Sequence, residues 1–355
     1  MPKNTNNFHN KLIIWYLENK RDLPWRKTKN PYHVWLSEII LQQTRVAQGL
    51  PYYLAFVDAF PTVFDLAKAP QEKVLKLWQG LGYYSRARNL HASAQYVSET
   101  LNGHFPTTYQ GLLKLKGVGD YTASAIASIC FNEPEAVVDG NVYRVLARVF
   151  GIETPINSTA GKKEFKQLAQ QLIQTNDPGM YNQAIMEFGA RHCVPQNPNC
   201  NTCIFANRCE AYKENKVSSL PVKLKKGKTK KRYFNYLVVI TKDDKTVLKQ
   251  RTGKGIWRQL YEFPLIESDQ ETSEEVLKEM KPFKEFSEKA TIDSVTLYND
   301  SLIVHKLSHQ HLYTRFWIVE VSEIQMNTVA FSEIENYAVP VLVENFISNF
   351  SVFKN

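Results

Sequence analysis

Two patterns of hydrophobic and polar residues divide the chain. Up to about residue 215, hydrophobic residues recur at spacings of three and four, the period of helices that pack on one face. From about residue 233 the pattern changes to short runs of β-branched and aromatic residues separated by polar turns. The sequence therefore predicts a mainly α first region, residues 1–215, and a separate α+β domain, residues 233–355.

The second region contains several strand-like runs and two helical ones. We expect the runs 236–240 and 246–248 to form a hairpin. A short helix is predicted from Thr272 to Met280 with Thr272 as its capping residue, and a last helix over 341–350. Further strands are predicted at 294–298, 302–307 and 312–321.

A glycine turn joins two helical segments in the first region. Gly117 and Gly119 bracket Val118, between a segment that ends near Leu115 and a helix that begins at Asp120. Such a turn points backbone N–H groups outward beside a helix N-terminus. These groups suit an anionic oxygen such as a DNA phosphate.

An acid follows the second of these helices. Asp139 ends an apolar run and directly precedes Gly140. In a purely DNA-binding surface a carboxylate is unexpected, because it repels phosphates. On the local sequence alone, the simplest role of Asp139 is to cap the helix that starts near Asn141.

A second acid lies on an apolar helix face. The helix begins at Asn30-Pro31, and by its spacing Glu38 shares a face with Val34, Trp35 and Leu41. Burial there would raise its pKa towards that of a usable general acid. The alternative is a residue at the rim of the face, paired with a nearby arginine.

Two tyrosines and two arginines follow a glycine turn at residues 80–88. Tyr83 and Tyr84 are suited to stacking on a nucleic-acid strand, and Arg86 and Arg88 to clamping it. The alternative is a packed turn with exposed charges.

Composition indicates an ordinary soluble protein without a secretion signal or membrane-spanning run, and we expect it in the cytoplasm. Its net charge of +9 comes largely from one segment, 216–232, which carries eight basic residues and no acid and leaves +1 for the rest. We interpret this segment as a basic interdomain linker. A short charge run does not by itself indicate nucleic-acid binding.

Four of the five cysteines lie within 17 residues of one another. In a chain without a secretion signal this clustering favours a metal site over disulfides, and the spacing leaves zinc and an iron–sulfur cluster open. Cys130 lies in an apolar helical pattern and is interpreted as a core residue. The clustered residues are Cys193, Cys200, Cys203 and Cys209.

Six motifs in this order resemble the MutY-type adenine DNA glycosylases, a family of helix–hairpin–helix base-excision enzymes related to endonuclease III. The similarity covers nearly the whole chain. The motifs are Leu23-Pro-Trp-Arg26, 35–44 (WLSEIILQQT), Gly80-Leu-Gly-Tyr-Tyr84, the hairpin at 117–119, Val138-Asp-Gly-Asn-Val142 and the four-cysteine loop.

The resemblance implies a catalytic role for both acids. Glu38 would deliver a proton to N7 of adenine and then help to activate water. Asp139 would remain ionised and either stabilise the oxocarbenium-like sugar or form a covalent intermediate. Tyr121 and Asn141 would hydrogen-bond near the sugar and the carboxylates.

The resemblance also implies how DNA is bound. Gln43 and Tyr83 would act as wedges in the base stack, and Gly117, Val118 and Gly119 would hold phosphate. Related strand-cleaving enzymes carry a lysine where this chain has Tyr121, so the resemblance implies a monofunctional glycosylase. A pocket for the flipped adenine would be formed by Trp25, Arg26, Leu41, Val46, Gln183 and Met186.

The same family carries a [4Fe–4S] cluster on the four cysteines and a Nudix-like domain that recognises 8-oxoguanine. The segment 255–264 is the nearest trace of the Nudix signature. The Arg-Glu-x-x-Glu-Glu helix of the hydrolases is missing, so we expect this domain to bind rather than hydrolyse. Ser308 and His309 are candidates for reading the damaged base, with Leu307 in place of the family's phenylalanine; a polar turn between strands is the alternative.

The sequence thus predicts a monomeric, nucleoid-associated enzyme that acts on double-stranded DNA containing adenine opposite 8-oxoguanine or guanine. One alternative is an endonuclease III-like lyase for oxidised pyrimidines, which Tyr121 and the second domain oppose. Another is a non-catalytic, cluster-containing DNA-binding module, which the presence of both Glu38 and Asp139 opposes.

Overall fold

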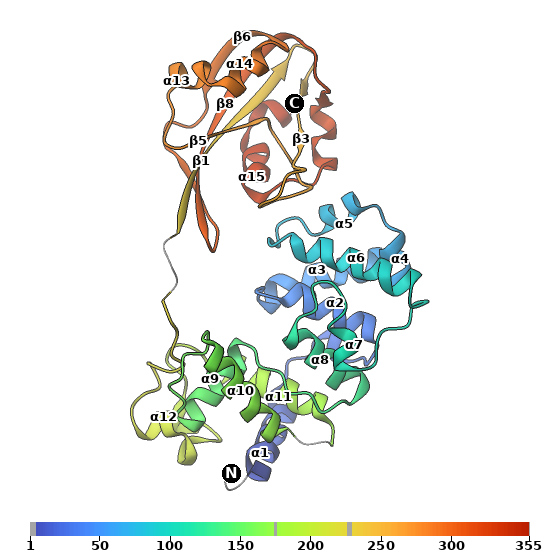
Figure 1. Cartoon of the computed structure of the whole chain (residues 1–355), viewed down its shortest axis with the longest axis vertical. Coiled ribbons are helices and arrows are strands. Elements are labelled where there is room, and N and C mark those ends of the chain that lie inside the picture. Colours follow the sequence, from blue (N-terminus) through green and yellow to red (C-terminus); the bar gives the residue numbers. More distant parts are fainter. Residues whose placement is uncertain (1–4, 174–175, 226–228, 355) are drawn as a thin grey trace. The chain divides into compact units, whose positions relative to one another are not determined.

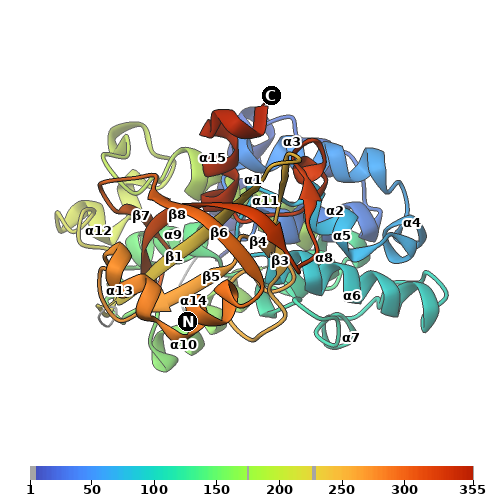
Figure 2. The same cartoon turned by 90° about the horizontal axis from the view of Figure 1, so that it is seen from above.

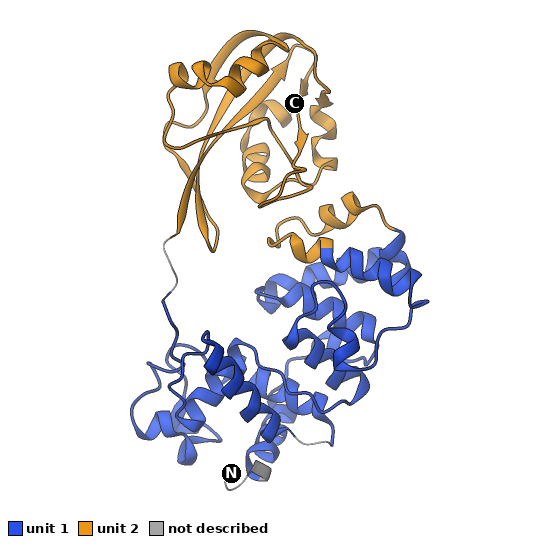
Figure 3. Ribbon diagram, viewed as in Figure 1, with its two compact units in different colours: residues 1–68, 89–225 blue, residues 69–88, 226–355 orange. Residues whose placement is uncertain are grey.

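The structure is a computed structural model that describes residues 5–173, 176–225 and 229–354. The chain divides into two compact units (Figure 3). The first consists of residues 1–68 and 89–225, and the second of residues 69–88 and 226–355. Within the second unit, the 69–88 segment is held by hydrogen bonds such as that from the backbone N–H of Val339 to Oε1 of Gln79, at 3.1 Å.

The first unit is built from helices, as the sequence predicts (Figure 1). Among the described residues these are α1 (Thr5–Asn19), η1 (Pro24–Arg26), α2 (Pro31–Leu41), α3 (Val46–Ala59), α4 (Val63–Lys68), α6 (Ser85–Glu99), α7 (Tyr109–Leu112), α8 (Asp120–Phe131), α9 (Gly140–Phe150), α10 (Thr159–Leu172), α11 (Pro178–Arg191), η2 (Cys200–Thr202), η3 (Ala206–Arg208) and α12 (Glu210–Lys213). In the second unit, α5 (Gln71–Leu77) precedes α6.

The helix–hairpin–helix differs from the prediction in its first arm. That arm is the single turn of α7, which ends at Leu112 and not at Leu115. Leu113 to Gly117 then form successive turns, and Gly117 has a φ of 80°, a conformation that favours glycine. The second arm, α8, begins at Asp120 as predicted.

Two glycines allow α11 to approach its neighbours closely. A Cβ on Gly179 would lie 2.8 Å from the carbonyl oxygen of Ser128 in α8. A Cβ on Gly189 would lie 2.7 Å from Cβ of Asn141 in α9. Because no side chain separates these backbones, α11 lies directly against the helices that present Tyr121 and follow Asp139.

Aromatic packing fixes the four-cysteine loop to the helical core. Phe205, between the third and fourth cysteines of the loop, is 1% exposed and stacks on Phe8 of α1 with ring centroids 4.6 Å apart. It also meets Phe188 of α11 edge to face at 5.3 Å. The loop therefore shares the core that positions α11.

The second unit contains a mixed sheet in the order β5-β1-β8-β6, with β7 also paired to β8 (Figures 1 and 2). The long central strands β1 and β8 are parallel, with Tyr236 opposite Phe316 and Leu237 opposite Trp317. The strands of the sheet are β1 (Lys230–Thr241), β5 (Leu265–Ser268), β6 (Ala290–Leu297), β7 (Ile303–Lys306) and β8 (Gln310–Ile324). Two small pairs are β2 (Lys245–Thr246) with β9 (Val329–Ala330) and β3 (Lys249–Gln250) with β4 (Tyr261–Glu262).

Helices cover both faces of this sheet. Leu237 and Trp317 share one face and pack in a cluster with residues of α13 (Glu274–Glu279) and α14 (Lys281–Ser287). Phe316 points to the other face, where its ring stacks on Phe346 of α15 (Val341–Asn349) with centroids 4.1 Å apart. The remaining helical segments are η4 (Phe331–Asn336) and η5 (Ser351–Lys354). The predicted α+β architecture is confirmed.

Two local predictions in this unit are wrong. The expected hairpin of 236–240 with 246–248 does not form, because β1 pairs with β5 and β8. A parallel partner so far along the chain leaves no local signature in the sequence. The predicted helix 272–280 is shorter, and Ser273 is its N-cap. The hydroxyl of Thr272 instead donates to Oγ of Ser268 at 2.9 Å.

The basic segment 216–232 has structured ends. Nζ of Lys216 lies 2.6 Å from a carboxylate oxygen of Glu153 and 2.8 Å from one of Glu214. Residues 230–232 form the start of β1. Residues 226–228 lie outside the described part of the chain, and the predicted linker boundaries stay a prediction. Among the described residues, the helices are all too short or too polar to cross a membrane.

Candidate active site

One cavity of about 550 Å3 in the first unit brings together both acids and their predicted neighbours. It is bounded by η1, α2, the start of α3, α8, the start of α9 and α11. Ten residues predicted from the sequence line it: Glu38, Asp139, Tyr121, Asn141, Trp25, Arg26, Leu41, Val46, Gln183 and Met186. Their catalytic and binding roles stay predictions.

Glu38 is buried in this cavity on the apolar face of α2. Glu38 is 8% exposed. The N-cap of its helix is Asn30, whose Oδ1 accepts the N–H of Tyr32 at 2.9 Å. Burial raises the pKa of Glu38 to about 7, and the charge of Asp139 acts in the same direction. A substantial fraction of Glu38 is therefore protonated at neutral pH.

Tyr121 joins Glu38 to the opposite wall. Its hydroxyl is a hydrogen-bond partner of the Glu38 carboxylate, and this contact opposes the rise in the pKa of Glu38. The same hydroxyl lies 3.3 Å from Sδ of Met186 on α11. Burial raises the pKa of Tyr121 further above its already high ordinary value, so the phenol stays neutral and serves as a donor.

Asp139 is the N-cap of α9. Its Oδ1 accepts the N–H groups of Asn141 at 2.9 Å and Val142 at 2.7 Å, and its Oδ2 accepts Nδ2 of Asn141 at 2.8 Å. Burial raises the pKa of Asp139, while these three donors oppose the rise. The three donors therefore favour the ionised form of Asp139, and the partial positive charge at the N-terminus of α9 also favours it.

The two carboxyl groups thus have contrasting surroundings. Glu38 lies in an apolar environment with a phenol as its hydrogen-bond partner, whereas Asp139 receives three N–H donors at a helix N-terminus. The capping role suggested by the local sequence is real for Asp139. It leaves the carboxylate at the wall of the cavity.

Arg144 continues the hydrogen-bond network of Asp139, and the sequence interpretation missed it. The arginine is 8% exposed, and its Nη2 donates to Oδ1 of Asn141 at 2.9 Å and to the carbonyl of Gly189 at 2.6 Å. Its Nε donates to the carbonyl of Cys193 at 2.6 Å. Its spacing of three from Asn141, on one helix face, was the available signal.

Glu187 is a second residue that the sequence interpretation missed. It is 1% exposed, and its carboxylate accepts Nε and Nη2 of Arg21 at 2.7 and 2.6 Å and Nη2 of Arg26 at 2.7 Å. Burial alone would raise its pKa, but the bonds from Arg21 and Arg26 lower the pKa to about 2. The available signal was its place four residues after Gln183, on the face already predicted to line the pocket.

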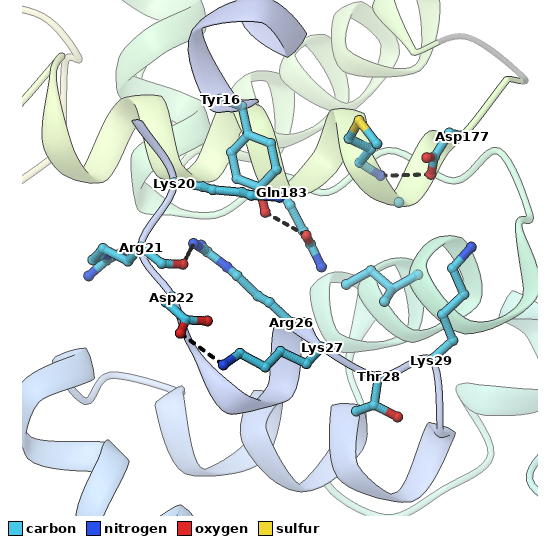
Figure 4. A pocket seen from close by; sticks show the side chains of 13 residues that line it. Tyr16, Lys20, Arg21, Asp22, Arg26, Lys27, Thr28, Lys29, Asp177 and Gln183 are labelled. Atoms are coloured by element: carbon cyan, nitrogen blue, oxygen red, sulfur yellow. Dashed lines mark hydrogen bonds and ion pairs between the residues drawn. The ribbon is translucent and has the colours of Figure 1, made fainter. Parts of the chain in front are cut away.

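A second cavity of about 420 Å3 adjoins the first and shares Arg21, Arg26, Ile129 and Gln183 with it. Figure 4 shows Tyr16 pointing toward Gln183 in this cavity. The Tyr16 hydroxyl donates to Oε1 of Gln183 at 2.7 Å, which holds the amide of a predicted pocket residue in a fixed orientation. Nothing in the sequence pattern singled out Tyr16.

The four clustered cysteines line one further cavity. None forms a disulfide. The cavity wall includes Arg148, whose guanidinium donates to the carbonyls of Val194 at 2.8 Å and Pro195 at 2.9 Å and approaches Sγ of Cys193 at 3.5 Å. In the described part of the chain, no three Cys, His, Asp or Glu side chains are placed to ligate one metal ion. Four thiols and a cation around a shared space match the donor set of an anionic metal–thiolate group.

Sequence comparison assigns the family. Residues 36–175 match the model of the HhH-GPD superfamily base excision DNA repair protein. The adenine DNA glycosylase of Buchnera aphidicola subsp. Baizongia pistaciae is 33% identical over 314 residues, which cover 88% of this chain and 86% of that protein. The chain belongs to the adenine DNA glycosylase family. Members of this family are hydrolases of N-glycosidic bonds.

Other relatives of this adenine DNA glycosylase family member match only part of the chain. The human adenine DNA glycosylase is 47% identical over 213 residues, 58% of this chain but only 39% of the human protein. The solved structure of a thermostable thymine-DNA glycosylase matches with a TM-score of 0.55 at 29% identity, over 59% of this chain and 97% of that one. The structure of an endonuclease III–DNA covalent intermediate matches with a TM-score of 0.52 over 60% of this chain and 98% of that one. Because the two sequences are only 21% identical, this match supports the fold alone.

Both glycines of the glycosylase hairpin are exposed to solvent, but only Gly119 has free space where a side chain would lie. A Cβ added to Gly119 would have no neighbour within 4 Å, whereas a Cβ on Gly117 would lie 2.9 Å from Cβ of Asn89. Nε2 of Gln42, at the end of α2, donates to Oγ1 of Thr122 at 3.1 Å and approaches the carbonyl of Gly117 at 3.4 Å. These contacts tie the helix that carries Glu38 to the hairpin.

Both predicted wedge residues have a left-handed backbone. Gln43 has a φ of 57° and Tyr83 a φ of 47°, and both side chains are exposed. Non-glycine residues in this region are uncommon, and such strain concentrates at functional sites. Tyr84 and Arg86, in contrast, are 5% and 7% exposed, so both are packed in the turn, and the expectation of an exposed charge is wrong for Arg86.

The second unit of this glycosylase matches a NUDIX domain model over residues 235–349. The predicted damage-reading residues lie in the tight turn between β7 and β8, where the N–H of Leu307 donates to the carbonyl of Gln310 at 2.8 Å. Ser308 and His309 are exposed at its tip, with Oγ and Nδ1 3.3 Å apart. This is the polar turn that the sequence left as an alternative, and its side chains are accessible.

Proposed function

We propose that this chain removes adenine paired with 8-oxoguanine, or with guanine, from duplex DNA. It would hydrolyse the N-glycosidic bond as a monofunctional glycosylase and act as a nucleoid-associated monomer. The observation that carries the proposal is the contrast between Glu38 and Asp139 in one cavity. A carboxylic acid that holds its proton near neutral pH and a carboxylate supported by three donors are the pair that glycoside cleavage requires.

Glu38 acts first, as the general acid. Its proton passes to N7 of the flipped adenine, and the electron pair of the bond between C1′ and N9 then leaves with the neutral base. Glu38, now ionised, accepts a proton from the water that attacks C1′. Its pKa of about 7 suits both steps, because neither protonation state is strongly disfavoured at the working pH.

Asp139 stabilises the sugar. Positive charge develops at C1′ and the ring oxygen as the base leaves, and the anionic carboxylate of Asp139 either stabilises this charge or bonds to C1′ until water displaces it. Asn141 holds the carboxylate through Nδ2 at 2.8 Å and is itself held by Arg144 at 2.9 Å. This anchoring keeps Asp139 oriented through both steps.

The pocket recognises the flipped base through donors and apolar walls. Trp25, Leu41, Val46 and Met186 provide the walls. Arg26 and Gln183 provide N–H donors, and their orientation is set by Glu187 and Tyr16 respectively. Adenine presents ring-nitrogen acceptors to such donors.

Strand cleavage is not part of the proposed reaction, because Tyr121 has no amine to form a Schiff base with the sugar. Adenine release should leave the DNA strand intact until base or heat is applied. Strand β-elimination as fast as adenine release would contradict this part of the proposal.

The remaining predicted residues recognise the DNA around the mispair. The N–H groups at Gly117, Val118 and Gly119 would hold phosphate, and the strained, exposed Gln43 and Tyr83 would fill the disturbed stack. Ser308 and His309 would contact 8-oxoguanine from their turn, with Leu307 beside them. Their exposure supports this assignment.

We further propose that Cys193, Cys200, Cys203 and Cys209 hold a [4Fe–4S] cluster. The support is the shared cavity of the four thiols, the absence of disulfides among them and the guanidinium of Arg148 beside Cys193, which would offset the negative charge of a thiolate-bound cluster. The cluster would stabilise the loop and has no part in the base-removal steps.

The test is single-turnover adenine release from a duplex with one adenine opposite 8-oxoguanine. Asp139→Asn preserves the helix cap, since asparagine is an equally good N-cap, but removes the charge. Asp65→Asn is the matched control, because Asp65 is an exposed carboxylate that accepts the N–H of Thr62 at 2.9 Å. We expect strong loss of release in Asp139→Asn and none in Asp65→Asn.

The outcomes separate the competing functions. No adenine release by the wild-type protein would exclude the proposed activity and favour the non-catalytic module. Release of an oxidised pyrimidine with strand cleavage would favour the lyase. Equal adenine release by the wild type and Asp139→Asn would remove the role assigned to Asp139.

A further inference from the structure

The hairpin that is proposed to hold phosphate carries an acid at its edge. Asp120 is the first residue of α8, directly after Gly119, and its side chain is 52% exposed. Gly119 is the N-cap, and a glycine has no side chain with which to occupy the first N–H groups of the helix. A carboxylate here is attracted by the same partial positive charge that would hold a DNA phosphate, and it repels that phosphate. Asp120 therefore opposes DNA binding unless its charge is offset.

Two side chains from outside α8 bind the Asp120 carboxylate. The hydroxyl of Tyr109, the first residue of α7, donates to its Oδ1 at 2.6 Å. Nζ of Lys166, on α10, lies 3.1 Å from the same oxygen. Burial raises the pKa of Tyr109 and the bond to Asp120 raises it further, so the phenol stays neutral and serves as a donor. The acid thus has both a hydrogen-bond donor and a cation beside it.

Neutral groups also fix the ammonium of Lys166. Its Nζ donates to Oγ of Ser124 at 3.0 Å and to the carbonyl oxygen of Ala136 at 2.8 Å. A second carboxylate, that of Glu135, is farther from Nζ than Asp120 is, at 3.7 Å against 3.1 Å. The Lys166 side chain is only 28% exposed. Because four groups surround it, the ammonium is held in one place beside Asp120.

We propose that Lys166 is a positioning residue for DNA binding. It neutralises Asp120 and holds the carboxylate beside Tyr109, so that the N–H groups at the start of α8 remain available to a phosphate. This inference rests on the proposed function, in which the hairpin holds the DNA backbone. Without Lys166, the carboxylate of Asp120 would compete with phosphate for the partial positive charge of the helix N-terminus.

The competing explanation is a purely structural role for Lys166. Its bond to the carbonyl of Ala136 supports the segment that leads to Asp139. Loss of this bond would have the same effect whether or not residue 120 is charged. Loss of neutralisation, in contrast, would weaken DNA binding only while Asp120 is an acid. The two explanations therefore differ in the effect of a Lys166 substitution when the charge of Asp120 has been removed.

The experiment measures binding of a short undamaged duplex to the full-length protein by fluorescence anisotropy. Lys166→Met is made in the wild type and in an Asp120→Asn background. Tyr109→Phe is a milder variant that removes only the hydroxyl. Lys213→Met is the matched control, because it removes an equal charge from an exposed pair with Glu210 at 3.0 Å. Thermal unfolding establishes that each variant is folded, and adenine release opposite 8-oxoguanine tests the proposed function separately.

We expect Lys166→Met to weaken duplex binding about fivefold in the wild type, the effect of roughly one close pair of like charges in water. In the Asp120→Asn background the same substitution should weaken binding less than about twofold. Tyr109→Phe should act in the same direction but less strongly, and Lys213→Met should change binding less than about twofold.

Equal losses from Lys166→Met in the two backgrounds would overturn the proposal in favour of the structural role. Unchanged binding by Lys166→Met in the wild-type background, or no duplex binding by the wild type, would also overturn it. If the wild type releases no adenine but the expected binding pattern is found, the role of Lys166 is supported and only the proposed function fails.

Discussion

Oε2 of Glu187, on α11, lies 2.7 Å from Nη2 of Arg26, in the short helix η1. The same carboxylate binds Arg21, so one anion that is 1% exposed holds two cations at the wall of the candidate active-site cavity. A buried charge is tolerated only with such partners. Glu187 therefore acts as a positioning residue for Arg26, which faces the predicted adenine pocket.

Glu187→Gln should destabilise the protein markedly, because it leaves two guanidinium groups without their anion. We expect the free energy of unfolding to fall by about 3 kcal/mol, the lower end for a broken buried pair, since the Arg21 side chain is 34% exposed. Urea denaturation measures this change. Glu279→Gln, which breaks an exposed pair with Lys284, should cost less than about 1 kcal/mol.

The stabilisation from Glu187 should also depend on pH. Its pKa is lowered in the folded state to about 2, so its contribution is complete above its ordinary pKa of 4.5 and is lost as pH falls towards 2. The difference between wild type and Glu187→Gln should therefore shrink between about pH 5 and pH 3. A difference that stays constant over this range would contradict the ion-pair explanation.

Adenine release should fall on the alkaline side of neutrality. Because burial raises the pKa of Glu38 to about 7, the protonated acid is lost above that pH, and the single-turnover rate should drop about tenfold per pH unit. On the acidic side the rate should fall as Asp139 is protonated. Glu38→Gln cannot donate a proton and should lower the rate by about 100-fold or more and abolish the alkaline limb. An alkaline limb that persists in Glu38→Gln would assign it to another group.

Glu38 should also lower stability at high pH. A carboxyl whose pKa rises from 4.5 to about 7 on folding destabilises the folded state as pH increases through that window, by roughly 3 kcal/mol once ionised. Glu38→Gln should therefore raise the melting temperature at about pH 8 and have little effect at about pH 4. A lower melting temperature of Glu38→Gln at alkaline pH would contradict the burial of an ionised group.

Local patterns predicted those helices whose start is marked in the sequence, as by Asn30, Gly119 and Pro340, with the apolar spacing following in each case. They missed α14 and the short strands β3, β4, β5 and β9. Pairing over long distances was not predictable: β1 has its parallel partner 80 residues away in the register of Tyr236 with Phe316. The same limit applies to the site. Glu38 and Asp139 each stand out in the local sequence, as acids on an apolar face or at the end of an apolar run, whereas Tyr16 acquires its role only through a contact with the distant Gln183.

The close approach of α9 and α11 should be sensitive to one methyl group. In Gly189→Ala the new Cβ would lie 2.7 Å from Cβ of Asn141 and 2.9 Å from its carbonyl oxygen, so the helices must separate. We expect a loss of about 1–3 kcal/mol in the free energy of unfolding, together with slower adenine release because Asn141 holds Asp139. Gly140→Ala, where nothing lies within 4 Å of the added Cβ, should leave stability almost unchanged. Equal stability of the two variants would contradict the tight contact.

The four-cysteine loop should depend on its metal group, because the loop lacks disulfides and has little regular structure beyond the single turns η2 and η3. Cys203→Ser should remove the absorbance band of an iron–sulfur cluster at about 410 nm and lower the bound iron. Phe205, in the same loop, packs against Phe8 and Phe188, so loss of the cluster should also loosen this core and lower the melting temperature. Cys130→Ala is the matched control, because Cys130 lies at the end of α8 away from the loop, and it should retain colour and iron. A colourless wild-type protein that contains zinc would replace the cluster with a zinc site on the same cysteines.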